Sequence, residues 1–336
     1  MPLESKFISK IKSKRIGDGG EPTDHAVSMA WMKALRSWNS SKKIYSINPY
    51  VEVYQFRENV YGLFSQNCDA AGDPWQYVII GPEKAMLIDT AFGLGDLKRL
   101  VDELTGGKPL MVVNTHPHPD HGYGNCRFDK VYCHEFSAWR LQHQDEHLWD
   151  YLFDKNGNNK WLEFDRADLP TFKPYEIVAV PDGYVFNLGG DHEIELKWVP
   201  GHHQGHAMFL DKKNRILIAG DGLCCHISGV GGGRRGDEPY YKYNNVQTFR
   251  NELAKLAARS NEFDSIFTMH LITDLPPVLL DQVIKTCDVI LNNPEDYDYA
   301  EDYKTGGGDI IPRRYKYVWG FGVLGYTEQG VYPLTE

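Results

Sequence analysis

The 336-residue chain lacks the features of several large protein classes. It contains no run of 18 apolar residues, so we expect no membrane-spanning helix. Its 36 lysines and arginines are outnumbered by 46 acidic residues, giving a formal net charge of -10. This balance predicts neither a nucleic-acid partner nor an acidic membrane partner, because either needs a basic face. The first 22 residues are basic without an apolar segment, so we expect no secretory signal.

Cysteine is scarce, and its spacing matches no common motif. The six cysteines, at positions 68, 126, 133, 224, 225 and 287, include no C-x-x-C pair. Without a secretory signal, this favours free thiols and a cytoplasmic location. The chain also has no internal repeat of 20–50 residues and no G-x-S-x-G motif, so a solenoid or a serine hydrolase is not indicated.

Apolar residues make up 42% of the chain and aromatic residues 13%, which is enough for a large core. Residues 1–45 are rich in lysine and arginine, and we predict a helical arm there that is either solvated or docked. We expect residues 46–336 to form one catalytic domain, with an aromatic-rich insertion at about 135–165.

Local patterns predict strands and helices that alternate along the chain. The stretch "YVIIGPEKAMLIDT" is typical of a hairpin that turns at residues 81–84. In "DLKRLVDELTGGK" apolar residues follow helical spacing, Asp96 can cap the start and Gly106 can end the helix. "PLMVVNTH" then predicts a buried strand. A second set of strands with interleaved helices follows from residue 176, so the sequence predicts an α/β fold.

The most informative stretch is "NTHPHPDHGYGN", residues 114–125, which follows that buried strand. Imidazole and carboxylate groups are the ligands that zinc and similar divalent metals prefer. In extended backbone His116 and His118 point the same way, while Asp120 and His121 can face a second point nearby. Pro117 and Pro119 stiffen the loop. The pattern predicts a metal site rather than a set of structural histidines.

Three later segments place further ligand types at predicted strand ends. They are "VPGHHQGH" with His202, His203 and His206, "IAGDGL" with Asp221, and "FTMH" with His270. Loops gather at strand ends over a sheet, so we expect these segments to supply the remaining ligands.

Taken in order, "LIDT", "THPHPDH", "PGHHQGH", "AGD" and the late His270 resemble the metallo-β-lactamase superfamily. The resemblance implies a four-layer αβ/βα sandwich of two mixed sheets flanked by helices. It also implies two metal ions, the first bound by His116, His118 and His202, and the second by Asp120, His121 and His270. Asp221 would bridge the ions, and Asp89 would orient the histidine loop by hydrogen bonds. His206 would pack behind the site and His203 would point away from it.

The aspartate at the bridging position resembles the glyoxalase II and lactonase-like branches of that superfamily. The resemblance therefore implies a dinuclear hydrolase in which the metal ions, most commonly zinc with manganese or iron as alternatives, activate water for attack on an acyl carbonyl. Asp120 would hold the attacking water and carry its proton. The expected substrate is a small molecule with an ester, lactone, thioester or amide bond. An iron-dependent oxidoreductase, a phosphodiesterase and a non-catalytic binding protein stay open as alternatives, and so does a homo-oligomer.

Weaker signals concern substrate binding and the loops around the site. Tyr123, His226, Trp149 and Trp161 are candidate substrate contacts, although the aromatic rings of residues 135–165 can equally form core and His226 can be structural. Cys224 and Cys225 suit either packing or a redox or metal role. The loop at 228–239 can cradle an anion with Arg234 and Arg235, or it can be a surface loop.

Overall fold

The computed structural model describes residues 35–36, 38–69, 72–232, 237–304 and 310–334. The chain divides into two compact units. The first comprises residues 1–132, 141–178 and 187–192, and the second comprises 133–140, 179–186 and 193–336. The predicted arm at 1–45 lies mostly outside the described residues. Its last residues form strand β1 (Lys43–Tyr45), which pairs with β2.

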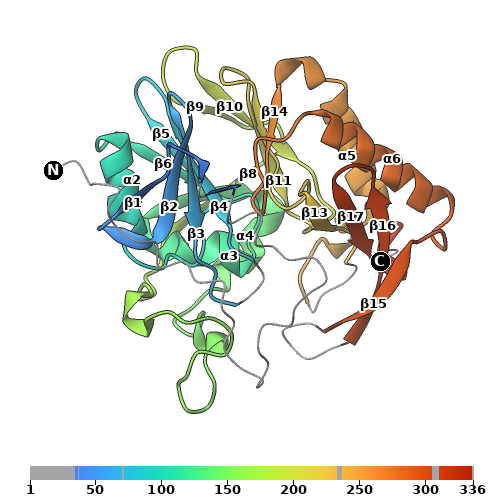
Figure 1. Ribbon diagram of the computed structural model, residues 1–336, viewed down its shortest axis with the longest axis horizontal. Coiled ribbons are helices and arrows are strands. Elements are labelled where there is room, and N and C mark those ends of the chain that lie inside the picture. The colour runs from blue at the N-terminus through green and yellow to red at the C-terminus, as the bar shows by residue number, and fades with distance from the viewer. Residues whose placement is uncertain (1–34, 37, 70–71, 233–236, 305–309, 335–336) are drawn as a thin grey trace. The chain divides into compact units, whose positions relative to one another are not determined.

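The first unit is built on a mixed sheet whose strands follow one another in chain order, coloured blue to green in Figure 1. Strands β1 to β5 pair antiparallel, and β5, β6 and β7 pair in parallel. Strands β7 and β8 continue past the boundary of the unit. The eight strands are β1, β2 (Asn48–Arg57), β3 (Val60–Ser65), β4 (Trp75–Ile80), β5 (Ala85–Ile88), β6 (Leu110–Val113), β7 (Lys130–His134) and β8 (Glu176–Val180).

The local predictions for this unit are confirmed. Strands β4 and β5 form the expected hairpin, and the backbone N–H of Gly81 donates to the carbonyl of Lys84 across the turn. Helix α2 (Leu97–Thr105) has Asp96 as its N-cap, whose carboxylate accepts from the backbone N–H of Arg99. Gly106 ends the helix with a φ of 65°, a left-handed conformation that glycine adopts without strain. The buried face of α2 packs on the sheet beside Val112 and Val131.

Two sheets lie in the second unit. The five-stranded sheet has the order β14-β12-β11-β10-β9, in which the β10–β11 and β11–β12 pairs are antiparallel and the β12–β14 pair is parallel. Its strands are β9 (Val185–Asn187), β10 (Glu193–Trp198), β11 (Ala207–Asp211), β12 (Ile216–Ile218) and β14 (Ser265–Phe267). The four-stranded sheet has the order β13-β17-β16-β15. Its strands are β13 (His226–Gly229), β15 (Tyr299–Lys304), β16 (Ile310–Val318) and β17 (Gly322–Tyr326).

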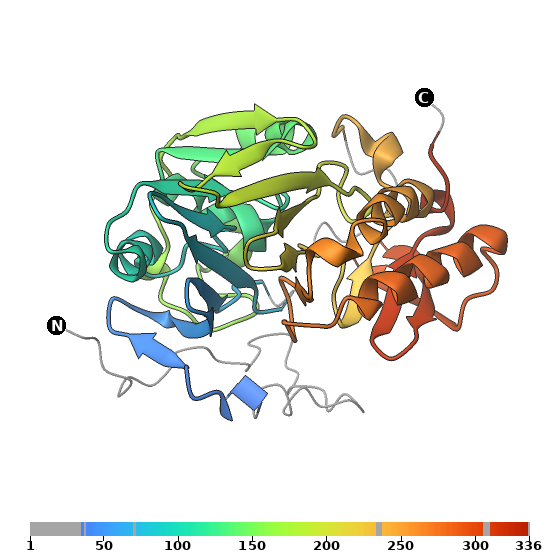
Figure 2. The same ribbon diagram turned by 90° about the horizontal axis from the view of Figure 1, so that it is seen from above.

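Helices α5 (Val246–Ala257) and α6 (Val278–Asn292) lie side by side in this unit, as both ribbon views show (Figures 1 and 2). Asn245 caps α5 by accepting from the backbone N–H of Thr248. Apolar residues of both helices share one core cluster with β11, β12 and β17. Helices interleaved with strands were predicted for this part of the chain, whereas the sheet that contains β15 to β17 was not.

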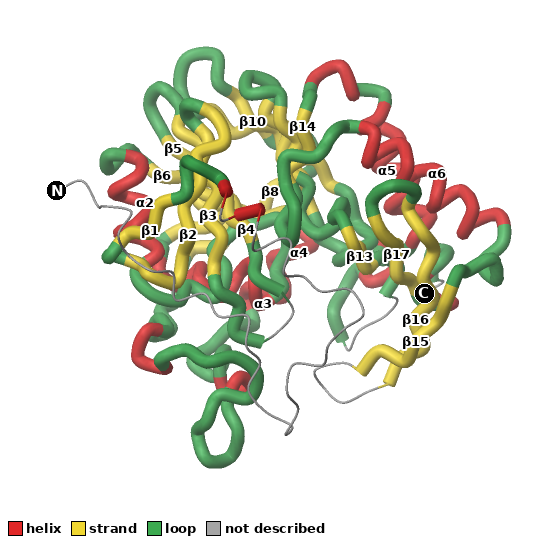
Figure 3. The backbone as a smooth tube through the Cα atoms, in the orientation of Figure 1, coloured by secondary structure: helices red, strands yellow, loops and turns green. Residues whose placement is uncertain are grey.

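The predicted aromatic insertion has little regular structure (Figure 3). Helix α4 (Glu135–Gln142) opens it, and loops joined by a short 3-10 helix at Asp150–Leu152 follow. Among the described residues, no helix has both the length and the apolar character needed to cross a bilayer.

His134 ends strand β7 and lies among aromatic residues of the second unit. It is buried, its ring stacks on Trp198 at 5.6 Å between centroids, and its Nδ1 accepts from the backbone N–H of Phe136. Burial lowers the pKa of His134 to about 4, against a small opposing effect of Asp182. The ring of His134 is therefore neutral in the folded protein at neutral pH.

We predict that His134 makes the free energy of unfolding fall as the pH drops from about 6.5 to about 4. In that window the unfolded chain takes up a proton on His134 and the folded chain does not, which costs up to about 1.4 kcal/mol per pH unit. Urea unfolding of wild type and His134→Asn at pH 7 and pH 4.5 measures the effect. The difference in unfolding free energy between wild type and His134→Asn should be larger at pH 7 than at pH 4.5. An equal difference at both pH values would contradict the lowered pKa of His134.

Candidate metal centre

In the first unit the histidine loop starts where β6 ends, and Asp89 follows the neighbouring strand β5. The two strands pair in parallel with Ile88 opposite Val113, so both chain segments leave the sheet at the same edge. The backbone N–H of Asp89 donates to the carbonyl of Val113. Asp89 has a φ of 63°, a left-handed conformation that aspartate tolerates better than most residues. This turn directs its carboxylate at the histidine loop.

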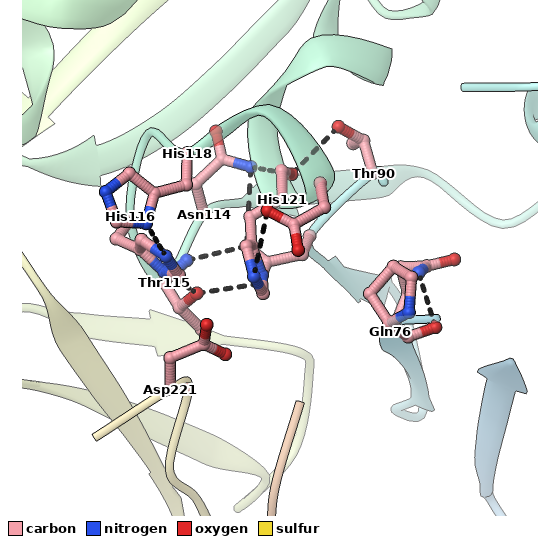
Figure 4. Close-up of polar contacts among 12 residues, drawn as sticks. Gln76, Thr90, Asn114, Thr115, His116, His118, His121 and Asp221 are labelled. Carbon is pink, nitrogen blue, oxygen red and sulfur yellow. Dashed lines mark hydrogen bonds and ion pairs between the residues drawn. The ribbon is translucent and has the colours of Figure 1, made fainter. Parts of the chain in front are cut away.

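Asp89 is fully buried and accepts four hydrogen bonds from that loop, the longest from the Asn114 amide to Oδ1 at 3.4 Å. Figure 4 labels the donor residues Asn114, Thr115 and His121. The backbone N–H of Thr115 donates to Oδ1 at 2.7 Å, the Thr115 hydroxyl donates to Oδ2 at 2.7 Å, and His121 Nδ1 lies 2.8 Å from Oδ2. Because an ionised carboxylate only accepts, Nδ1 of His121 must carry the proton. The other ring nitrogen of His121 is then available as a metal ligand.

The same logic fixes the tautomer of His116. The Thr115 hydroxyl gives its only proton to Asp89, so its oxygen accepts from His116 Nδ1 at 3.0 Å. His116 Nε2 is then unprotonated, and it lies 2.9 Å from His118 Nδ1. His118 Nδ1 therefore carries the proton of this hydrogen bond and donates it to His116 Nε2. A metal ion that binds these two nitrogens would displace that proton.

A network of amides and hydroxyls fixes the backbone of the loop. The carbonyl of His121 accepts from the backbone N–H of Thr90 at 2.9 Å and from the Asn114 amide at 3.0 Å. Asn125 donates to Asn114 and accepts from the Thr90 hydroxyl (Figure 4 labels Thr90 and Asn114). Asn125 ends the "GYGN" part of the motif, where the sequence gave no reason to select it.

In the second unit the strand register places two candidate ligands at one sheet edge. Strands β12 and β14 are parallel with Ile218 opposite Phe267, and Asp221 and His270 each come three residues later. His270 Nε2 lies 3.4 Å from Asp221 Oδ2. His202 Nε2 lies 3.5 Å from the same oxygen. The three ligand types that the sequence placed at separate strand ends therefore converge within this unit.

These distances suit a shared metal ion better than direct hydrogen bonds. Two ligands that each lie about 2.0–2.2 Å from a tetrahedral ion are about 3.4 Å from each other. The His202–Asp221 and His270–Asp221 pairs have this separation, and Asp120 Oδ1 lies 3.6 Å from His121 Nε2 in the first unit. Nitrogen and carboxylate donors in this arrangement fit a borderline divalent metal such as zinc.

His206 supports the turn that carries Asp221. Its Nδ1 donates to the carbonyl of Val199 at 2.9 Å, so its Nε2 is the acceptor. The backbone N–H groups of Asp221 and Gly222 point at that nitrogen from 3.1 and 3.3 Å. Gly220 has a φ of 55°, and a Cβ there would lie 2.2 Å from His206 Nε2, so only glycine fits.

His203, the residue after His202, is buried and contacts Glu238. Its Nδ1 accepts from the backbone N–H of Gly205, so its Nε2 donates to Glu238 at 3.1 Å. Burial lowers the pKa of His203 to about 4. Although burial raises the pKa of Glu238, hydrogen bonds from His203 and Gln204 and the charge of Arg140 outweigh it and hold that pKa at about 2. Glu238 was not selected from the sequence, where the glycines and arginines of 228–239 drew attention instead.

The candidate substrate contacts in the first unit belong to an apolar cluster. Trp149 is 6% exposed and packs there, while Tyr123 and Trp161 are partly buried at its margin. Tyr123 contacts Tyr151 edge to face at 6.3 Å, and Tyr151 packs on Trp161 at 5.8 Å. The Tyr151 hydroxyl donates to Asp69, and burial raises its pKa, so the hydroxyl stays protonated. The buried position of Trp149 favours a packing role for that ring.

The remaining candidates lie in the second unit or outside the described residues. His226 is exposed at the start of β13 with a φ of 82°. Cys224 and Cys225 are buried free thiols, and burial raises the pKa of both, which fits packing rather than reactivity. Arg234 and Arg235 lie outside the described residues.

Comparison with known proteins decides the family. A family model described as the metallo-beta-lactamase superfamily matches residues 70–263, more than half of the chain. The chain belongs to the metallo-beta-lactamase superfamily. This confirms the family predicted from the motifs and the α/β fold class. Six of the seven predicted ligands fall inside the matched range, and His270 lies just beyond it.

The chain is also similar to curated relatives and to solved structures over part of its length. The acyl-coenzyme A thioesterases MBLAC2 of Homo sapiens and Bos taurus are 30% and 29% identical over 165 residues, covering 43% of this chain and 56% of each relative. The chain thus spans about half the length of these relatives. A metallo-beta-lactamase from Pontibacter korlensis is 15% identical with a TM-score of 0.49, covering 70% of this chain and 97% of that one. The DIM-1 metallo-beta-lactamase is 17% identical with a TM-score of 0.47, covering 70% and 96%.

We predict that Asp89→Asn weakens metal binding about 10–100-fold while the chain still folds. Asparagine tolerates the left-handed backbone, but its amide presents a donor where the carboxylate accepts four hydrogen bonds. Competition with a chromophoric chelator measures the affinity. Asp211→Asn is the control, because Asp211 is also buried but contacts the turn residue Asn214. Unchanged affinity in Asp89→Asn would show that Asp89 only shapes the strand end.

Proposed function

We propose that this protein is a dinuclear metal-dependent hydrolase that cleaves an acyl thioester of a small molecule. The observation that carries the proposal is that His202 Nε2 and His270 Nε2 lie 3.5 and 3.4 Å from the same Asp221 oxygen, so each histidine can share an ion with Asp221. Superfamily membership supports metal-dependent hydrolysis. The thioester is favoured over the ester, lactone and amide alternatives because the curated relatives are named acyl-coenzyme A thioesterases.

The proposed ligands follow the superfamily pattern read from the sequence. His116, His118 and His202 would bind one ion, Asp120, His121 and His270 the other, and Asp221 both. The tautomers support this assignment where they can be derived. Nδ1 of His116 donates to the Thr115 hydroxyl, and Nδ1 of His121 donates to Asp89. Nδ1 of His202 donates to the carbonyl of Gly229 at 2.8 Å. Each of these rings therefore has Nε2 available for a metal ion. Zinc is the proposed metal, and a cytoplasmic location stays a prediction.

When bound, two such ions lower the pKa of water toward neutrality and polarise an acyl carbonyl. Asp120 is the residue that we propose to act on the attacking water. Its carboxylate is only 6% exposed and can accept a hydrogen bond from the water and then take up its proton. That proton passes to the departing thiolate when the carbon–sulfur bond breaks, so the products are a carboxylic acid and a thiol. Asp89 acts through His121, whose ring it orients.

Three rings at the edge of the apolar cluster, Tyr123, Tyr151 and Trp161, form an aromatic margin of the first unit. This aromatic margin supports an apolar acyl group as part of the substrate. Tyr123 follows the histidine loop directly and contacts Tyr151, which in turn contacts Trp161. These three rings are only partly buried, in contrast to Trp149. Partly exposed rings beside a metal loop can cover an acyl chain and exclude water from it.

We predict that the protein binds two metal ions per chain at saturation. His118→Ala and Asp221→Ala should each lower the metal content and abolish thioester hydrolysis, because each removes a proposed ligand. Elemental analysis of protein reconstituted with zinc, measured with turnover of an acyl thioester, provides the check. A wild-type protein that saturates at one ion with full activity would contradict the dinuclear mechanism.

We predict different effects for the two tryptophans. Trp161→Ala should raise the KM for a long-chain acyl thioester about tenfold, about 1.4 kcal/mol, and leave the KM for an acetyl thioester nearly unchanged. Trp149→Ala should instead destabilise the fold by about 3–5 kcal/mol, because its ring is in the core cluster. Steady-state kinetics with both substrates and urea unfolding test the pair. If Trp161→Ala affects both substrates alike, the aromatic margin does not bind the acyl group.

A further inference from the structure

We infer that Glu238 is a positioning residue for the metal ligand His202. The inference rests on the proposed function, because it assumes that His202 binds a metal ion. Glu238 lies 36 positions further along the chain and contacts neither His202 nor Asp221 in any interaction described here. It acts instead through the two residues that follow His202.

The first observation is the set of donors around the Glu238 carboxylate. Oε2 accepts from His203 Nε2 at 3.1 Å and from the Gln204 amide at 2.7 Å. Oε1 accepts from the Arg140 guanidinium, at 3.0 Å, at the end of helix α4. The carboxylate is 15% exposed and His203 is 3% exposed, so these contacts are largely protected from water. Charge-assisted hydrogen bonds in such surroundings are stronger than exposed ones.

The second observation is independent of Glu238 and comes from residues 229–231. The carbonyl of Gly229 accepts from His202 Nδ1 at 2.8 Å, and the backbone N–H of Gly231 donates to the carbonyl of Gly201 at 2.8 Å. The loop at 201–204 is therefore bound on one side by residues 229–231 and on the other by Glu238. Both groups come from the part of the chain that runs from the end of β13 to α5.

Helix α4 completes the arrangement from a third direction. The Ser137 hydroxyl donates to the carbonyl of Gly205 at 2.8 Å, and a Cβ on Gly205 would lie 2.3 Å from the backbone nitrogen of Ser137. The helix thus contacts the loop closely one turn before Arg140. These contacts restrict the loop at 201–204 to one backbone conformation, so the ring of His202 is oriented before any metal ion binds.

The consequence is a role for Glu238 that differs from simple stabilisation. Loss of its charge leaves His203 Nε2 and the Gln204 amide without a charged acceptor, so residues 203–204 can take other conformations. The entropy of ordering the loop must then be supplied when the ion binds. A change at Glu238 should therefore lower metal affinity more than a change elsewhere that destabilises the fold by the same amount.

The test compares Glu238→Gln with Glu195→Gln. Glu195 is a suitable control because it is also a partly buried carboxylate of the second unit, 19% exposed and paired with Arg259 rather than with the ligand loop. We expect Glu238→Gln to weaken zinc binding about tenfold in chelator competition, and Glu195→Gln to leave it unchanged. The unfolding free energy of both metal-free variants is measured in urea to match their stabilities.

Equal zinc affinity in wild type and Glu238→Gln, or an equal loss in both variants, would overturn the inference. If Glu238→Gln does not fold, Arg140→Met decides, since it removes one donor and keeps His203 and Gln204. A fall of about threefold in zinc affinity then supports the inference, and no change overturns it. Failure of the proposed function is distinguishable: without the metal site the wild-type protein itself binds no zinc, and with the metal site but another reaction it binds zinc and does not hydrolyse the thioester.

Discussion

The hydrogen bonds that the Asp89 carboxylate accepts are the interaction on which the first half of the proposed ligand set depends. A buried carboxylate is costly unless its oxygens are satisfied, and here the donors are the backbone and hydroxyl of Thr115, the ring of His121 and the amide of Asn114. The same bonds determine which nitrogen of His121 and His116 is left for a metal ion. Sheet pairing of β5 and β6 places the carboxylate, and the carboxylate then determines the chemistry of the rings.

In the second unit it is the strand register that brings the proposed ligands together. Asp221 and His270 are brought to one edge because β12 and β14 are parallel and in phase, although 49 residues separate them. His202 arrives from β10 on a loop that contacts residues 229–231, Glu238 and Ser137. In both units the proposed ligands follow short strands, and neighbouring buried side chains fix their orientation. This matches the general rule that outer contacts determine ligand geometry at metal sites.

Much of this could be predicted from the sequence where the signal was local. The hairpin at 81–84, the caps of α2 at Asp96 and Gly106, and the strand before the histidine loop depend on neighbours in sequence, and all are confirmed. The superfamily was predictable because its five motifs occur in order. The sheet of β15 to β17 was missed because its strands mix charged and aromatic residues, such as Arg313, Arg314 and Tyr315, without clear alternation. Glu238 was missed because nothing near it in sequence shows that it contacts His203.

The central claim is that nitrogen and carboxylate ligands of this chain bind two ions close together. X-ray absorption at the zinc edge, on protein with two equivalents of zinc, tests it most directly. The account predicts a ligand shell of nitrogen and oxygen at about 2.0–2.2 Å and a zinc–zinc contribution at about 3.5–4 Å. A sulfur shell near about 2.3 Å, which would bring in a cysteine such as Cys224, or the absence of any zinc–zinc contribution would contradict it.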